Sequence, residues 1–76
     1  MASELRYTVL LLPEPEGGFT VRVPALPAVV SHGINEGDAL RMAREAIELI
    51  LEVMRDDGEE PPPDVVPLIR QVTVTV

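Results

Sequence analysis

The chain has 76 residues, no cysteine, a single histidine and a net charge of −7 at pH 7. The lack of cysteine excludes disulfides and thiolate metal sites, and one histidine excludes a multi-histidine metal site. The negative charge argues against nucleic acid or an anionic membrane as a direct partner, because phosphate binding needs clustered cations, and it favours a basic partner.

A domain this short buries a small fraction of its surface and is only marginally stable alone. Disulfides and metals are not available to strengthen it, so oligomerisation remains, and we expect a homodimer or tetramer. No secretory signal stands near Met1, and no apolar run approaches the length of a membrane span. We therefore expect one domain over residues 1–76, located in the cytoplasm and with no membrane partner.

The first third of the chain predicts an antiparallel hairpin. Residues 5–12 form its first strand, whose second half is apolar on both faces because of Leu10 and Leu12. Such a strand is expected at the centre of a sheet or beneath a partner. The proline- and glycine-rich residues 13–18 form the turn, and residues 19–23 form the second strand by clean alternation.

The next segment predicts a corner and a short third strand. Residues 24–27 contain two prolines, which cannot donate to a strand ladder, so we expect a tight connection with Leu26 turned inward. Residues 28–31 then form the third strand, with His32 as its alternative end, and the chain turns at Gly33.

Residues 35–55 predict one long helix that organises the fold. Asn35 can cap its first turn, and Glu36 and Asp38 place negative charge beside the positive end of the helix dipole. Its apolar face covers roughly 200°, which is more than packing on one sheet requires. We expect a deeply packed helix with Ile50 central to the core. One of two apolar flanks can in addition meet another chain: Met42, Leu49 and Val53 on one side, or Leu40, Ile47 and Leu51 on the other.

Residues 69–76 predict a last strand, with valines on one face and polar side chains on the other. Because an exposed edge invites aggregation, this strand should lie inside the sheet or pair across a symmetry axis, and its proline-rich tether can carry it onto a neighbouring subunit. The order β-β-β-α-β is an α+β fold with one helix packed on a mostly antiparallel sheet. The residues expected at an oligomer interface are apolar: Met42, Leu49, Val53, Val72 and Val74.

The side chains indicate little catalytic chemistry. The hydroxyl residues have only His32 as a possible base, and no motif orients it. We interpret His32 as an exposed residue at a strand end, the alternatives being a pH-sensitive contact or a partner contact. We expect no catalytic residue, cofactor or metal.

Carboxylates gather in the first turn and in the loop after the helix. No spacing makes them converge on a metal ion, so a solvated acidic face is the plain interpretation. The alternative is a docking surface for a basic protein. The candidate partner-binding residues are then Glu14, Glu16, Asp56, Asp57, Glu59 and Glu60.

One stretch combines several weak signals at fixed distances. Residues 16–27 have the sequence EGGFTVRVPALP, and Gly33 and a helix containing Ala39 and Ala43 follow. The combination resembles the HicB-like family, the antitoxins of HicA/HicB toxin–antitoxin pairs and their stand-alone relatives. The resemblance implies a partly degenerate ribonuclease-H-like fold without nuclease activity. It also implies a homo-oligomer that binds a small basic toxin, an mRNA interferase, and covers its RNA-binding surface and catalytic histidine.

The sequence departs from that family at three places, one of which is Gly37, where family members usually carry a residue more favourable to a helix. Family members often carry Gly-Cys where this chain has Ala28 and Val29, which we interpret as a packing substitution. Antitoxins of this family commonly add a C-terminal helix-turn-helix or ribbon-helix-helix domain for operator binding. This chain ends at Val76, so we expect no C-terminal DNA-binding domain and no autoregulation.

The leading hypothesis is a non-enzymatic HicB-like antitoxin domain that binds and occludes a HicA-type toxin. The alternative is a stand-alone oligomeric binding module with an unknown ligand. A third hypothesis is a residual metal-dependent nuclease. It is disfavoured because the strands carry Val, Thr, Arg and Leu where active ribonuclease-H relatives need metal-binding acids.

Overall fold

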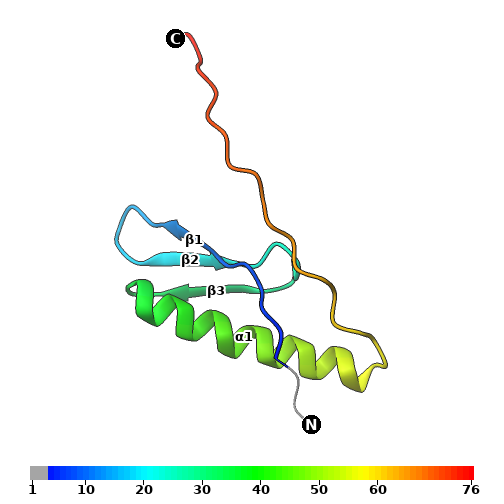
Figure 1. Cartoon of the computed structure of the whole chain (residues 1–76). Coiled ribbons are helices and arrows are strands. Elements are labelled where there is room, and N and C mark those ends of the chain that lie inside the picture. The colour runs from blue at the N-terminus through cyan, green and yellow to red at the C-terminus, as the bar shows by residue number, and fades with distance from the viewer. Residues whose placement is uncertain (1–3) are drawn as a thin grey trace.

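The computed structural model describes residues 4–76 as a three-stranded antiparallel sheet with one helix packed on one face (Figure 1). The elements are β1 (Leu10–Pro13), β2 (Phe19–Arg22), β3 (Val30–Gly33) and α1 (Glu36–Asp56). The strand order is β1-β2-β3, so β2 is central and the other two strands are edges. The predicted α+β class, the hairpin and the order of three strands before the helix are confirmed.

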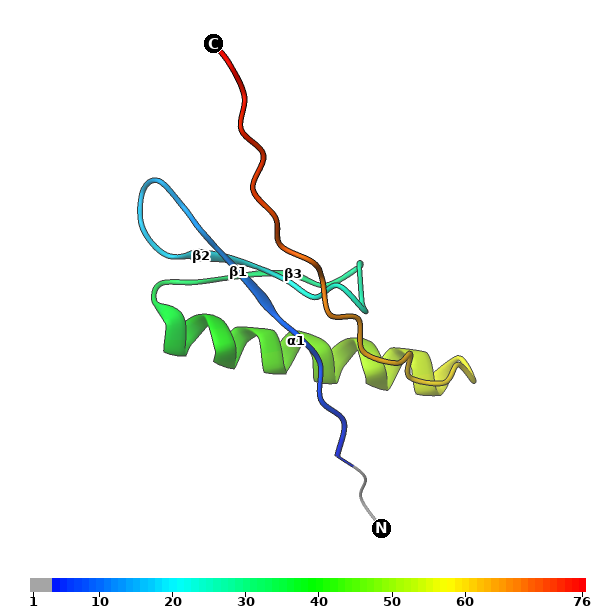
Figure 2. The ribbon, with the colours of Figure 1, turned by 45° about the horizontal axis from the view of Figure 1, so that its top comes forward.

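The first strand is shorter than predicted. Its ladder with β2 begins at Leu10, which lies opposite Arg22, and not at Leu5. β2 cannot extend the ladder further because Pro24, two residues after its end, has no amide hydrogen to donate. Residues 5–9 therefore approach β1 without pairing to β2 and cross the middle of the helix (Figure 2).

The connection between β2 and β3 consists of two successive tight turns. The Leu26 amide donates to the Val23 carbonyl at 3.0 Å, and the Val29 amide donates to the Leu26 carbonyl at 2.9 Å. The Leu26 side chain is buried, as predicted. Because the second turn ends only at Val29, β3 begins at Val30, two residues later than the predicted strand over 28–31.

The helix is closed at both ends by local chemistry. The Asn35 side chain accepts a hydrogen bond from the Asp38 amide at 2.8 Å, and the Asp38 carboxylate in turn accepts from the Ile34 amide at 3.0 Å. After the last turn, Gly58 adopts φ +77°, a left-handed conformation that glycine takes without strain. The helix and its cap are thus confirmed within one residue of the predicted bounds.

The core has two parts because the helix is much longer than the strands. A 21-residue helix spans about 30 Å, whereas a four-residue strand spans about 13 Å. Under the sheet, the buried residues are Val21, Ala39 and Ala43. Beyond the sheet, the helix packs against the turns between β2 and β3, where the buried residues are Val23, Leu26 and Val29.

Two small residues occupy the deepest positions of the helix. Ala39 and Ala43 are fully buried, and Gly33 at the end of β3 lies directly against the backbone of Ala39. Small side chains here let the helix approach the sheet closely. Ile50, expected to be central to the core, is half-buried and packs at the edge of the second cluster. That expectation is corrected: the most buried helix residues are the small ones nearest the sheet, Ala39 and Ala43, and not the larger Ile50.

The C-terminal segment is tied to the start of the chain and then leaves the domain. The Tyr7 hydroxyl donates to the Pro62 carbonyl at 2.7 Å. The Thr8 amide and hydroxyl donate to the two carboxylate oxygens of Asp64, at 2.8 and 2.7 Å. Beyond Asp64 the chain runs away from both sheet and helix in both views (Figures 1 and 2).

The segment predicted as the last strand is extended but unpaired. Within residues 4–76, the ladders join only β1, β2 and β3. Val72 and Val74 are 84% and 73% exposed, so the predicted position inside the sheet is not reached within one chain. The prediction is therefore corrected for the single chain: residues 69–76 form no fourth strand of its sheet.

Two glycine substitutions should have opposite effects on stability. An added Cβ at Gly33 would overlap the Ala39 backbone, which cannot move without lifting the helix from the sheet, so Gly33→Ala should destabilise the fold by about 3 kcal/mol. Gly37 lies in the first turn of the helix, where an added Cβ would be 3.6 Å from the nearest atom, the Asn35 Oδ1. Gly37→Ala should therefore stabilise by about 0.5–1 kcal/mol. Denaturant unfolding at one fixed protein concentration measures the free energy of unfolding of both variants. Equal changes in the two variants would contradict the close approach of the helix to Gly33.

Acid should release the C-terminal segment from Thr8. The two hydrogen bonds from Thr8 hold the pKa of the Asp64 carboxyl below its ordinary value of 3.8. A lowered pKa means that the ionised form is favoured in the folded chain. Its contribution is therefore complete above the ordinary value and is lost as the pH falls through the lower folded-state pKa. We expect the Thr8 amide to lose hydrogen-exchange protection as the pH falls below about 4.

A matched pair of variants separates this contact from general acid effects. Asp64→Ala should remove the protection of the Thr8 amide at pH 7, while Asp57→Ala, at the exposed end of the helix, should leave it unchanged. Protection that is independent of pH and survives in Asp64→Ala would show that the contact does not form in solution.

Candidate functional site

The six candidate acidic residues lie in two clusters at opposite ends of the molecule. The hairpin turn that carries Glu14 and Glu16 lies at the end where α1 begins (Figure 1). The other four follow the far end of α1: Asp56, Asp57, Glu59 and Glu60. The fold therefore does not bring the six together. A partner that contacted both clusters would have to span the length of the helix.

The first cluster surrounds a shallow hollow, which we call the hairpin hollow. It has a volume of about 520 Å³ and is lined by residues 14–17 and by His32. Glu14 is half-buried and accepts a hydrogen bond from the Thr20 hydroxyl, whereas Glu16 is exposed. Strand pairing places His32 opposite Thr20, so the only histidine lies beside the acidic turn. The sequence did not predict this neighbour, because the turn and β3 meet only through the β2–β3 register.

The second cluster, which we call the C-terminal acidic cluster, comprises the four residues after the helix. All four are exposed, and Asp56 has one loose ion pair with Arg55, with 3.8 Å between Oδ1 and Nε. The C-terminal end of a helix carries partial negative charge, so carboxylates there are locally unfavourable and add to the same field. This end of the molecule therefore presents a concentrated negative potential.

The outward face of the helix is different, because its charges pair with one another. Arg41 contacts Asp38 at 2.7 Å and Glu45 at 3.0 Å, and Arg44 lies 3.9 Å from Glu48. The Ile34 amide and the Arg41 guanidinium both donate to Asp38 and lower the pKa of its carboxyl. Arginines held in this way do not form a basic patch for phosphate.

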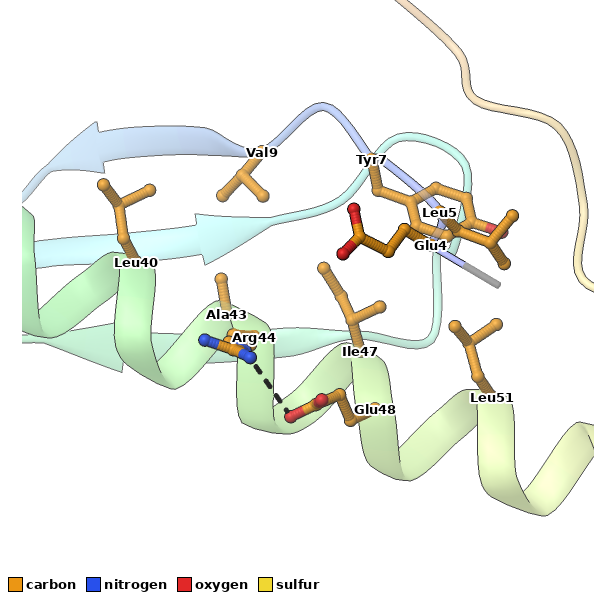
Figure 3. Close-up of a pocket in the computed structure, with 10 residues that line it drawn as sticks. All are labelled: Glu4, Leu5, Tyr7, Val9, Leu40, Ala43, Arg44, Ile47, Glu48 and Leu51. Carbon is orange, nitrogen blue, oxygen red and sulfur yellow. Dashed lines mark ion pairs between the residues drawn. The ribbon is translucent and has the colours of Figure 1, made fainter. Parts of the chain in front are cut away.

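An apolar groove runs between the N-terminal segment and the helix (Figure 3). Its volume is about 520 Å³. One wall comes from residues 4–9, mainly Leu5, Tyr7 and Val9, and the rim carries the Arg44–Glu48 pair. The helix wall includes the whole of one flank predicted for partner contact: Leu40, Ile47 and Leu51. The sequence did not predict the groove, because residues 5–9 were expected within the sheet.

The other predicted flank of the helix is also accessible. Leu49 and Val53 are 63% and 46% exposed, and Met42 is half-buried. Val72 and Val74, the remaining candidates for an oligomer interface, lie on the extended C-terminal segment, away from that flank (Figure 1). The five residues proposed for one interface are therefore divided between two separate surfaces.

The part of the chain from 4 to 76 contains no group of three or more His, Asp or Glu side chains positioned to hold a metal ion. Within this range α1 is also too polar to cross a membrane.

Comparison with known proteins identifies relatives over most of the chain. Residues 7–73 match the family model described as the HicB-like antitoxin of bacterial toxin–antitoxin systems. The UPF0150 protein Ta0767 of Thermoplasma acidophilum is 33% identical over 60 residues, which are 79% of this chain and 87% of that protein. Antitoxin HicB 1 of Photorhabdus laumondii subsp. laumondii is 36% identical over 58 residues, 76% of this chain.

The second of these relatives is much longer than the matched region, which makes up 37% of its length. The family model spans nearly the whole chain, from Tyr7 at the groove to Thr73 in the extended segment. Both the sheet and the helix lie inside this match. The chain therefore belongs to the HicB-like antitoxin family.

Proposed function

We propose that this protein is a non-catalytic antitoxin that binds and occludes a small basic HicA-type toxin, an mRNA interferase. The observation that carries the proposal is family membership over residues 7–73, which implies a toxin partner. The identity of that toxin class comes from the resemblance in residues 16–27 and agrees with the similarity to Antitoxin HicB 1.

The charge distribution supports a basic partner. A toxin that binds mRNA needs cations for the phosphates, and an acidic protein can cover them and speed the encounter. The C-terminal acidic cluster is exposed and lies at the negative end of the helix, so it is the surface best suited to such docking. The hairpin hollow offers a second, weaker contact, since Glu14 already accepts a hydrogen bond from Thr20.

The placement of the hydroxyl residues supports a non-catalytic role. Ser31 and His32 are neighbours on β3, so their side chains point to opposite faces of the sheet. Thr20 lies on the same face as His32, but its hydroxyl donates to Glu14. In neither arrangement does the hydroxyl donate to His32, the imidazole base that would activate it as a nucleophile.

We further propose that the protein acts in the cytoplasm as a homodimer or tetramer. Large apolar side chains stand exposed on the helix and on the C-terminal segment, including Leu49, Val53 and Val72. Clusters of this kind on a small protein mark interaction surfaces. Self-association would bury them and strengthen a fold whose own core is small.

The test is a binding titration against an inactivated HicA-type toxin, together with an RNA-cleavage assay using the active toxin. The protein should block cleavage at near-equal molar amounts, and binding should weaken with added salt. Neutralising the C-terminal acidic cluster (Asp56→Asn, Asp57→Asn, Glu59→Gln, Glu60→Gln) should weaken binding about tenfold or more.

Two controls define the surface. The pair Glu14→Gln and Glu16→Gln should weaken binding less, and Glu52→Gln, an exposed carboxylate on the outer helix face, should have no effect. Full toxin activity in the presence of excess protein would contradict the proposal. Losses in proportion to the charges removed (four, two and one), with a loss in Glu52→Gln as well, would show that net charge, and not a docking surface, governs binding.

A second candidate function is a stand-alone oligomeric binding module. The match with UPF0150 protein Ta0767 supports it, because the matched unit makes up 87% of that relative. The apolar groove beside Tyr7 would then be the ligand site. A stable oligomer that leaves the toxin fully active would favour this second function.

A further inference from the structure

The C-terminal residues 69–76 have the pattern of a strand but no sheet to join. Valine recurs at every second position from Val72, as in a strand with one apolar face. Ile69, Val72 and Val74 are each more than 70% exposed. Among the residues that the structure describes, none pairs with this segment. Exposed unpaired backbone with a valine face is a template for strand addition.

The segment cannot be accommodated on its own sheet. The contact between Thr8 and Asp64 sets the point where the C-terminal segment meets the edge that leads into β1. Stepping residue by residue from there in parallel, Pro13, the last residue of β1, would face Ile69. Everything after Ile69 would then overhang the hairpin turn. The valine-rich part of the tail is therefore beyond the reach of the strand beside which it is anchored.

The outer edge of β1 lacks a neighbouring strand. Its sequence is apolar on both faces, a pattern typical of a central strand, yet it has a neighbour only on its β2 side. Leu10 and Leu12 lie on the sheet face opposite the helix, and Leu12 is 47% exposed. In one copy of the chain, the strand that its side chains require is missing.

We propose that two copies exchange these segments, with residues 69–76 of each copy adding as a strand to the outer β1 edge of the other. The proposal rests on the proposed self-association and specifies how it occurs. Each copy has one free strand and a free outer β1 edge, so a reciprocal exchange about a two-fold axis pairs the two in both copies. The occupant is therefore a second copy of this chain.

The reach of the segment is sufficient. Twelve residues follow Asp64, and in extended form they span about 40 Å. This length exceeds the four-residue edge of β1 and includes a connection between the two domains. Pro67 lies in that connection, where the lack of an amide hydrogen does not interrupt the added strand. Each sheet would gain its fourth strand, the one predicted from the sequence.

A proline scan of the full chain tests the exchange. In an added edge strand, alternate amides point toward the partner strand and the others point to solvent. Of the four variants Val72→Pro, Thr73→Pro, Val74→Pro and Thr75→Pro, one alternating pair should weaken dimerisation about tenfold or more, while the other pair has little effect. Sedimentation velocity measures the dimer. Far-UV circular dichroism should show the same helical signal in all four, because the substituted segment lies outside the fold of the single chain and only the added strand is lost.

Cross-linking gives a direct readout because the chain has no native cysteine. A mixture of the Leu12→Cys and Val74→Cys variants, treated with a short bismaleimide, should give a heterodimer. The matched control is Val53→Cys with Val74→Cys, which places one thiol on the exposed helix flank and should give little product.

The outcomes separate the exchange from self-association and from antitoxin function. A monomer at all concentrations would overturn both the exchange and the proposed oligomer. A dimer that tolerates all four prolines, or that cross-links through Val53 instead of Leu12, would overturn the exchange alone. Toxin inhibition is measured in its own assay and does not enter either result.

Discussion

The close approach of the helix to the sheet is the constraint on which the rest of the structure depends. It occurs where Gly33, Ala39 and Ala43 bring two backbones together without intervening side chains. The Asn35 cap starts the helix immediately beside this point and so sets its direction. With its first half held under the sheet, the long helix projects beyond the strands. Its second half must find other cover, which the β2–β3 turns and residues 5–9 supply.

The projection of the helix beyond the strands also explains where the apolar groove and the acidic clusters lie. Residues 5–9 cover the helix only in part, so an apolar groove remains between them. The acidic loop is carried to the far end of the helix, away from Glu14 and Glu16 (Figure 1). The candidate carboxylates are therefore divided between the two ends of the molecule, while ion pairs engage Arg41 and Arg44 on the outer helix face between them. In the proposed antitoxin, this arrangement would separate the surface for electrostatic docking from the surfaces for apolar contact.

The C-terminal segment is the other consequence of a small, asymmetric core. It is tied at Asp64 to the chain before β1 and then has no further surface to pack on. Its valines and the free β1 edge are complementary features left open in one copy. An exchanged strand would satisfy both and would make the sheet of each copy depend on its partner. The stability of each copy and the number of strands in its sheet would then both depend on whether the dimer forms.

Local chemistry made much of the fold predictable from the sequence. The Asn35 cap, the glycine-rich hairpin turn and the alternation in residues 19–23 act within a few residues, so the helix and the hairpin could be predicted from them. The acidic residues and the family resemblance could likewise be recognised from the sequence alone. Ile50 was placed too deep, because a helical wheel gives direction but not distance from the sheet.

Only the tertiary structure decided how these pieces meet. It separated the six acidic residues, brought His32 beside Glu14, and opened the groove by ending the β1–β2 ladder at Leu10. It also left residues 69–76 without a partner, although their alternation alone predicts a strand. The physical reason is the same in each case. Side-chain pattern specifies which face of an element is apolar, but the length and position of its neighbours decide whether anything lies there to cover it.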